Sequence, residues 1–317
     1  MVYKGKFIAF GPVPSRRLGH SLGINNIPPK ICTYSCIYCQ LGRTNNFQVE
    51  RKKFYEPQDI LNSVKEKIKS TNNGIIDYIT FIPNGEPTLD INLRKEIELV
   101  KSSGIKVAVI SNASLMWRDD VRDELSKADW VSVKIDAISQ DIWHRVNRPY
   151  KTLKLNKILN GISKFSKTFE GELATESMLI KNLNDSQREI EKIADFIKKL
   201  HSKKSYISIP TRPPAEKWTE PTGEININIA YQIFNERGID VELITGYEGN
   251  AFSSTGNLEE DILSITAVHP IREDGINELL KKTGKHWDLI EDLLKKGKII
   301  ETEYKNKKFY LRKIQKN

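Results

Sequence analysis

The chain has 317 residues, of which 38% are apolar and 29% are charged, and its formal net charge is +9. This composition describes a globular chain and excludes the fibrous and disordered classes. No run of about 18 apolar residues is present, and the first six residues lead into no long apolar stretch. We therefore expect neither a membrane span nor a secretory signal. The length allows one barrel-sized domain with a small appendage, or two medium domains.

The first 245 residues alternate apolar, strand-like runs with charge-rich amphipathic stretches. This alternation predicts an α/β fold with a parallel sheet and right-handed crossovers, and six units give a partial (βα)6 barrel. The expected strands are Leu22–Ile27, Ile76–Pro83, Lys106–Ile110, Val131–Asp136, Leu173–Ile180 and Tyr206–Pro210. The expected helices are Pro57–Ser70, Ile91–Ser103, Arg118–Ser126, Leu153–Thr168 and Ser186–Leu200, followed by a helix at Asn226–Arg237 and a strand at Asp240–Ile244.

A second, smaller domain is expected after the barrel. Residues 246–257 are rich in Gly, Ser, Thr and Asn and are predicted to be a linker between residues 1–245 and residues 258–317. In the last segment we expect three helices and a two-stranded hairpin: Leu258–His269, Glu273–Thr283, Lys285–Lys296, Ile299–Tyr304 and Lys308–Leu311. That α+β order resembles a winged helix, a module that binds nucleic acid in some proteins and mediates protein contacts in others. Both roles stay open.

The positive charge permits an RNA partner but does not require one, since a Lys- and Asn-rich composition bias gives the same balance. Residues 1–254 contain 37 basic and 30 acidic residues, a net charge of +7, whereas residues 255–317 have a net charge of +2. Any anion-binding surface is therefore expected mainly on the barrel.

The chain has three cysteines, Cys32, Cys36 and Cys39, within eight positions. An odd, clustered set is a poor disulfide framework, and we expect a cytoplasmic protein. A zinc site would need a fourth ligand, for which His20 is the nearby candidate. Three thiolates spaced Cys-x3-Cys-x2-Cys can instead bind three irons of a [4Fe–4S] cluster and leave the fourth iron open. We favour the cluster over zinc.

The segment from Cys32 to Cys39, with the aromatic Tyr38 before the last cysteine, resembles the radical S-adenosylmethionine (SAM) superfamily. The resemblance implies one [4Fe–4S] cluster, with SAM chelating its open iron through amino and carboxylate groups. It also implies a reductant such as flavodoxin or ferredoxin. Electron transfer in that family cleaves SAM into methionine and a 5′-deoxyadenosyl radical.

Polar residues stand where the predicted strands end, as expected for the catalytic edge of a parallel barrel. Asn84-Gly85-Glu86-Pro87 resembles the Gly-Gly-Glu-Pro motif of the superfamily, with Asn84 in place of the first glycine. The motif implies that backbone and carboxylate hold the amino group of SAM. Ser111 and Asn112 suit ribose hydroxyls or the SAM carboxylate, and a helix cap explains each of them equally well.

Alternation places Lys134 and Asp136 on one face of their strand, pointing into the barrel. Buried charges must be paired or bound, so the two side chains either pair with each other or contact SAM, as the resemblance suggests. In the next strand Glu176 and Met178 share a face, and Glu176 is expected to face the SAM ribose or the substrate.

Basic residues outside these strands are candidates for binding an anionic substrate. The candidates are Arg16, Arg17, His20, Arg148 and Arg212. For Arg148 we favour a simple role in capping a helix end. The stretches Phe10–His20, Gly85–Leu89 and Thr211–Glu216 together resemble the branch of the superfamily related to wyosine-synthase-type enzymes, over about residues 8–220.

Three functions follow from these observations. The first is a radical SAM enzyme that modifies tRNA or rRNA. Wyosine-type synthases use a second cluster and so need further cysteines, which this chain lacks, so we do not expect that particular reaction. The second is a radical SAM enzyme that acts on a protein or peptide. The third is a non-catalytic iron–sulfur regulator that binds nucleic acid, which leaves the polar strand ends unexplained.

Overall fold

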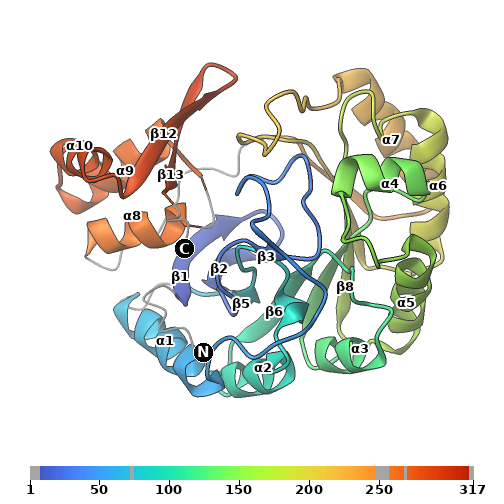
Figure 1. The fold of residues 1–317 in the computed structure, drawn as a ribbon, viewed down its shortest axis with the longest axis horizontal. Coiled ribbons are helices and arrows are strands. Elements are labelled where there is room, and N and C mark those ends of the chain that lie inside the picture. Colours follow the sequence, from blue (N-terminus) through green and yellow to red (C-terminus); the bar gives the residue numbers. More distant parts are fainter. Residues whose placement is uncertain (1–7, 72–74, 247–256, 268–269, 314–317) are drawn as a thin grey trace.

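The computed structural model describes residues 8–71, 75–246, 257–267 and 270–313. Within them one eight-stranded sheet runs in the order β1-β2-β5-β6-β7-β8-β9-β10. The sheet curls into a partial barrel with helices around its outer face (Figure 1). The predicted α/β partial barrel is therefore confirmed.

All strands of this sheet except the first run parallel. They are β2 (Gly19–Ile24), β5 (Tyr78–Phe81), β6 (Lys106–Ser111), β7 (Trp130–Lys134), β8 (Glu172–Met178), β9 (Lys204–Ser208) and β10 (Val241–Ile244). The surrounding helices are α1 (Pro57–Ser70), α2 (Leu93–Lys101), α3 (Asp119–Leu125), α4 (Gln140–Asn147), α5 (Leu155–Thr168), α6 (Gln187–Lys198) and α7 (Glu224–Glu236).

The sequence did not predict two of these elements. Strand β1 (Ala9–Ser15) pairs antiparallel with β2 at the sheet edge, where Pro12 and Pro14 are tolerated because an edge strand can spare the N–H groups that proline lacks. Prolines normally argue against a strand, so no strand was predicted here. Helix α4 has eight residues, too few for a clear helical period.

Alternation along the strands separates an apolar outer face from a mixed inner face. Val107 and Val109 of β6, and Val131 and Val133 of β7, are fully buried in the main core under the helices. Their neighbours turn the other way, where Ala108, Trp130, Ala174 and Tyr206 form a small apolar cluster inside the barrel. Polar residues in the inward register at the strand ends therefore lie inside the barrel.

The tail has its own apolar core and packs on the open edge of the barrel. It contains α8 (Leu258–Thr266), β11 (Ile271–Arg272), α9 (Glu273–Thr283), α10 (Asp288–Lys295), β12 (Ile299–Tyr304) and β13 (Lys307–Arg312), with a sheet in the order β11-β13-β12. Helix α8 lies against β1 (Figure 1), and Lys67 of α1 pairs with Asp261 of α8 at 3.7 Å.

These elements match the three helices and hairpin predicted for the tail, with β11 added. The first helix is shorter than Leu258–His269, since it ends at Thr266. Of the predicted linker, residues 247–256 lie outside the described residues. Across the described part of the chain, no helix combines the length and apolar character needed to cross a membrane.

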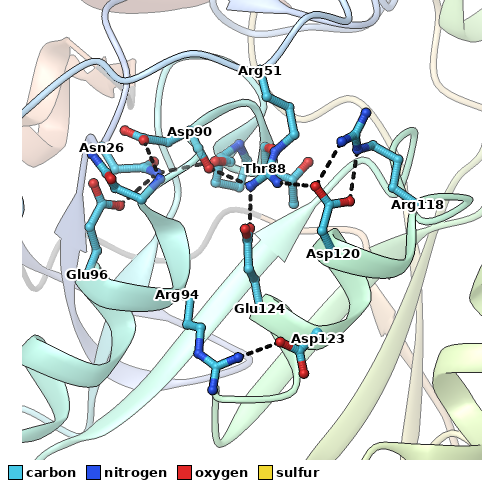
Figure 2. Close-up of polar contacts among 12 residues, drawn as sticks. Asn26, Arg51, Thr88, Asp90, Arg94, Glu96, Arg118, Asp120, Asp123 and Glu124 are labelled. Atoms are coloured by element: carbon cyan, nitrogen blue, oxygen red, sulfur yellow. Dashed lines mark hydrogen bonds and ion pairs between the residues drawn. The ribbon is translucent and has the colours of Figure 1, made fainter.

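A buried arginine fixes the turn that follows β5 (Figure 2). Arg51 donates to the backbone oxygens of Thr88 and Asp90, at 2.8 and 2.7 Å. Its guanidinium also pairs with Asp120 at 2.8 Å and with Glu124. The turn after β5 is thereby tied to the start of α3.

On the other side of this turn, Asn26 donates through Nδ2 to Pro87 O and Glu96 Oε2, both at 3.2 Å (Figure 2). Asp90 and Glu96 are both fully buried. Burial raises the pKa of each, and the charge of Asp90 raises that of Glu96 further. Asp90 Oδ2 and Glu96 Oε1 have no hydrogen-bond partner among the described residues. A proton on the Glu96 carboxyl would provide the missing donor.

This arrangement predicts that the stability of the wild type depends on pH through Glu96, and that Glu96→Gln lacks this dependence. In the unfolded chain a glutamate loses its proton near pH 4.3, whereas Glu96 retains it in the folded state, so wild-type stability falls as the pH rises above that value. The amide cannot ionise. The free energy of unfolding of the variant, relative to wild type, should therefore increase by up to about 1.4 kcal/mol per pH unit from about pH 4.5 upward.

Urea unfolding over a pH series measures this difference. Glu98→Gln, on the exposed face of the same helix, serves as the matched control and should track the wild type. Parallel stability profiles for Glu96→Gln and wild type would show that Glu96 is ionised in the fold.

Candidate active site

The three cysteines lie on a loop whose two ends are held together by a pair of short strands. Strand β3 (Ile31–Cys32) pairs with β4 (Asn46–Phe47), and the N–H of Cys39 donates to Cys36 O at 3.1 Å. All three cysteines are free and partly exposed. They line one cavity of about 320 Å³, which also includes the carboxyl ends of the parallel strands from β5 to β10.

Two amide side chains reach the thiols from other elements. Asn112, after β6, donates to Cys32 Sγ, and Asn147, at the end of α4, donates to Cys36 Sγ, each at 3.5 Å. Burial raises the pKa of Cys32, and it raises that of Cys36 to about 12. The raised pKa values favour the protonated thiols of Cys32 and Cys36 in the absence of metal, so iron binding must displace these two protons.

Lys30 provides a test of whether an anionic cluster fits here. Its Nζ is buried and has no hydrogen-bond partner among the described residues. Burial lowers the pKa of Lys30, while Cys39 and Cys32 act to raise it. Three free thiols beside an unpartnered ammonium group match an iron–sulfur cluster, whose thiolates and sulfides carry net negative charge. The residues present therefore fit the group.

The zinc alternative required His20 beside the cysteines. The structure instead places His20 at the amino end of β2, where its ring contacts Asp77 at 3.3 Å on the exposed surface. Across the described ranges, no group of three or more His, Cys, Asp or Glu side chains is placed to hold a single metal ion.

The Gly85-Glu86 turn packs directly against the strand that carries Cys32. A Cβ atom on Gly85 would lie 1.8 Å from the carbonyl oxygen of Ile31, so only glycine fits. The group that lies closest to Gly85 is therefore the backbone of the cysteine loop. The N–H of Glu86 donates to the same oxygen at 3.2 Å.

The Glu86 carboxylate joins the ends of β5 and β6. Its Oε1 accepts from the hydroxyls of Ser111 and Thr88, both at 2.6 Å, and its Oε2 accepts from the N–H of Asn112 at 2.7 Å. Burial raises the pKa of Glu86 even though these donors act to lower it. Ser111 and Asn112 thus position Glu86 and the cysteine loop.

An ion network crosses the inside of the barrel. Glu176 of β8 pairs with Lys134 of β7 at 2.9 Å and with Arg17 at 2.8 Å, and accepts from the hydroxyl of Ser208 at 3.1 Å. Burial acts to raise the pKa of Glu176, but Arg17 and Lys134 outweigh it and hold that pKa at about 2. Lys134 therefore pairs with Glu176, so the alternative of a Lys134–Asp136 pair is wrong.

Asp136 connects the cysteine loop to the neighbouring strand ends through hydrogen bonds. It accepts from the Tyr38 hydroxyl, from Asn147 Nδ2 at 2.7 Å and from the N–H of Met178 at 2.8 Å. Asp136 thus connects the aromatic residue before Cys39 to the ends of β7 and β8. It does not line the cavity.

Most of the predicted cofactor residues meet at the cavity. Those that line it are Tyr38, Asn84, Gly85, Glu86, Ser111, Asn112, Lys134, Glu176 and Met178, whereas Pro87 and Asp136 lie outside its lining. Pro87 begins a short 3-10 turn, Pro87–Leu89, behind Glu86.

The five predicted substrate residues separate into two groups. Arg17 and Arg212 line the cavity, and Arg212 donates to Gln40 Oε1 at 3.0 Å. Arg16, His20 and Arg148 do not line it. Arg16 lies against Gly246, and Arg148 follows α4 with a φ of 45°. The favoured role of Arg148 as a helix-end residue agrees with this position.

The sequence analysis did not single out three residues that contribute to the site: Lys30, Arg43 and Glu216. Lys30 precedes Cys32 by two positions, and that proximity to the predicted cluster was an available signal. Arg43 and Arg148 both pair with Glu216, whose side chain is buried. Together, Arg43 and Arg148 lower the pKa of Glu216 to about 2. This triad links the cysteine loop, α4 and the loop after β9, a contact that no local pattern reveals.

The fold and the cysteine site define a class of protein. The chain belongs to the radical SAM superfamily, whose family model matches residues 26–197, and it is a radical SAM enzyme. Enzymes of this family use a [4Fe–4S] cluster and SAM, and the three cysteines line the cavity described above.

The chain is 48% identical over 310 residues to UPF0026 protein MJ1312 of Methanocaldococcus jannaschii, and the aligned region covers 97% of each of the two chains. A more distant relative, at 25% identity over 239 residues, is the probable dual-specificity RNA methyltransferase RlmN of Thermotoga petrophila, covering 68% of this chain and 65% of that protein. Among solved structures, TYW1 with a lysine-pyruvate adduct bound has a similar fold, with a TM-score of 0.53 and 19% identity over 69% of this chain and 75% of that one.

The cysteine loop leads to a prediction for Cys36→Ala. Anaerobic reconstitution of the wild type should give about one [4Fe–4S] cluster per chain by iron and sulfide analysis. The variant lacks one of three ligands and should retain less than half of this content. Asn45→Ala, exposed on the same loop, is the control and should match the wild type. A full cluster in Cys36→Ala would remove Cys36 from the ligand set.

Proposed function

We propose that this enzyme reductively cleaves SAM and uses the resulting 5′-deoxyadenosyl radical to modify RNA, either tRNA or rRNA. When bound, the cluster supplies the electron for cleavage, which a flavodoxin or ferredoxin delivers in the cytoplasm. The cavity supports this proposal because three thiols and the carboxyl ends of the strands share it.

The chain's residues have distinct tasks in this proposal. Cys32, Cys36 and Cys39 hold the cluster. The Gly85-Glu86 turn presents backbone and carboxylate to the amino group of SAM. Lys134, Glu176 and Met178 line the opposite strand ends and orient its ribose and carboxylate. Arg17 and Arg212 bind an anionic part of the substrate.

Glu176→Gln tests the role of the ion network in this chemistry. The amide removes the charge that two buried cations share, so Lys134 and Arg17 lose their partner and the SAM-facing wall shifts. With dithionite and SAM, 5′-deoxyadenosine formation should fall about a hundredfold relative to wild type, which corresponds to a misplacement of about 1 Å.

Chromatography of the reaction products measures this loss, with cluster content checked in each sample. Glu236→Gln, an exposed carboxylate on α7, is the matched control and should form 5′-deoxyadenosine at the wild-type rate. No 5′-deoxyadenosine from fully reconstituted wild-type protein would favour the non-catalytic regulator.

The position of the tail hairpin carries the RNA part of the proposal. The hydroxyl of Tyr304, at the tip of the β12–β13 hairpin, donates to Pro210 O at 3.2 Å. This contact sets the hairpin beside the loop that leads to Arg212 at the cavity (Figure 1). Lys305 and Lys307 are exposed at the hairpin tip.

In this proposal, the hairpin and exposed arginines of the barrel act together as one basic surface. On the barrel side, Arg43 has a side chain that is 70% exposed, and Arg148 is 39% exposed. Lysine and arginine side chains spaced along one surface bind a phosphate backbone, and an enzyme that acts on a base takes that base out of its stack into a pocket. The RNA methyltransferase relative and the resemblance to the wyosine-synthase-type branch also favour RNA.

The double variant Lys305→Ala/Lys307→Ala tests this surface. Each lost phosphate contact lowers RNA affinity and reduces the slope of log K against log salt, by about 0.7 for a single strand and about 0.9 for duplex DNA. Binding of bulk tRNA and of rRNA, isolated from a strain lacking this protein, should weaken with a slope lower by about 1 to 2.

Lys281→Ala/Lys285→Ala is the matched control, because these lysines are also exposed but lie in and just after α9, not on the hairpin. If both double variants bind RNA with wild-type salt dependence, the hairpin does not bind RNA. Mass spectrometry of nucleosides and of the proteome from the deletion strain then decides between an RNA and a protein substrate.

A further inference from the structure

One side chain joins the turn after β5 to the tail. Asn84 is 3% exposed, and its Nδ2 donates to the backbone oxygen of Ala267, just past α8, at 2.6 Å. Its backbone N–H donates to Asn25 Oδ1 at 3.2 Å, and its carbonyl oxygen accepts from the N–H of Lys30 at 2.7 Å. Asn84 therefore contacts the tail, the end of β2 and the start of the cysteine loop at once.

The contact with Ala267 fixes which way the amide of Asn84 points. A backbone carbonyl only accepts, so the NH₂ group must face Ala267 and Oδ1 must face away. This Oδ1 is buried and has no hydrogen-bond partner among the described residues, while Asn84 itself lines the cavity. A buried carbonyl oxygen without a donor is unfavourable unless a ligand provides one.

We propose that Asn84 couples occupancy of the cavity to docking of the tail, with its Oδ1 accepting from the amino group of the bound ligand while its Nδ2 holds Ala267. This inference rests on the proposed function in that the ligand is SAM. It goes beyond that function because it makes the tail part of the SAM site. The glycine that the family motif has at this position could make neither contact.

The coupling works in both directions. If the docked tail orients Asn84 toward the ligand and so increases SAM affinity, SAM must stabilise the docked tail by the same factor. Bound SAM should therefore slow amide hydrogen exchange in residues 258–267, although none of these residues lines the cavity.

The full chain with its cluster reconstituted is used for the test, in three forms: wild type, Asn84→Ala and Asn84→Gly. SAM affinity is measured by equilibrium binding, and exchange of residues 258–267 by mass spectrometry with and without SAM. Both variants should bind SAM about tenfold more weakly, as expected for loss of one hydrogen bond to a charged group. They should also show faster exchange in residues 258–267, with no protection on adding SAM. An unchanged cluster content in each variant shows that the barrel has folded.

Lys67→Gln is the matched control, because it removes another contact between barrel and tail at a site outside the cavity lining. It should accelerate exchange in α8 but lower SAM affinity much less than the Asn84 variants do, because Asn84 keeps its contact with Ala267 and its Oδ1 for the ligand. Equal losses of SAM affinity in Lys67→Gln and Asn84→Ala would overturn the proposal, since any loosening of the tail would then suffice.

Wild-type SAM affinity in both Asn84 variants would also overturn it, as would weaker SAM binding with unaltered exchange of residues 258–267. Failure of the proposed function has a different signature. The wild type with a full cluster would then not bind SAM, while Asn84→Ala would still accelerate exchange of residues 258–267 in the absence of SAM.

Discussion

The close packing of the Gly85-Glu86 turn on the cysteine loop is the constraint on which the rest of the site depends. The Ile31 carbonyl occupies the space that a Cβ of Gly85 would need, and it accepts from the N–H of Glu86. The Glu86 carboxylate then connects this turn to Ser111 and Asn112 at the end of the next strand. Asn112 in turn contacts Cys32 Sγ. A single polar chain therefore fixes the cysteine loop relative to two strands.

The inside of the barrel combines charges with apolar side chains because its strands alternate. Val133 and Ile135, on either side of Lys134, are buried in the main core, so Lys134 faces the barrel interior, where it meets Glu176. Leaving either one alone there would be costly. Arg17, which comes from the loop between β1 and β2, provides a second cation for Glu176. The β1–β2 hairpin thus contributes to the electrostatics of the cavity as well as closing the sheet.

Local patterns were sufficient to predict the barrel and the cysteine loop, since both depend on short spacings. The Cys-x3-Cys-x2-Cys spacing, the strand–helix alternation and the polar strand ends can all be read within a few residues. The Arg17–Glu176 pair joins positions 159 residues apart, and the Arg43–Glu216 pair joins positions 173 apart. No periodicity carries such information. The same limit applies to the ion pair of Lys134. Its partner is Glu176 on the adjacent strand and not Asp136 on its own strand.

The placement of the tail changes how the charge of the chain should be understood. Counted by domain, most of the net positive charge belongs to the barrel, which argued against the tail as an independent RNA-binding module. In the structure, the contact of Tyr304 with Pro210 brings the tail hairpin, with Lys305 and Lys307 exposed, next to the loop that leads to Arg212 in the cavity lining. A phosphate backbone responds to the local density of cations and not to the domain that supplies them. Hydrogen bonds between Asn84 and Ala267, and between Tyr304 and Pro210, join the tail to the barrel at and beside the cavity, so the tail is positioned to act as part of the catalytic unit.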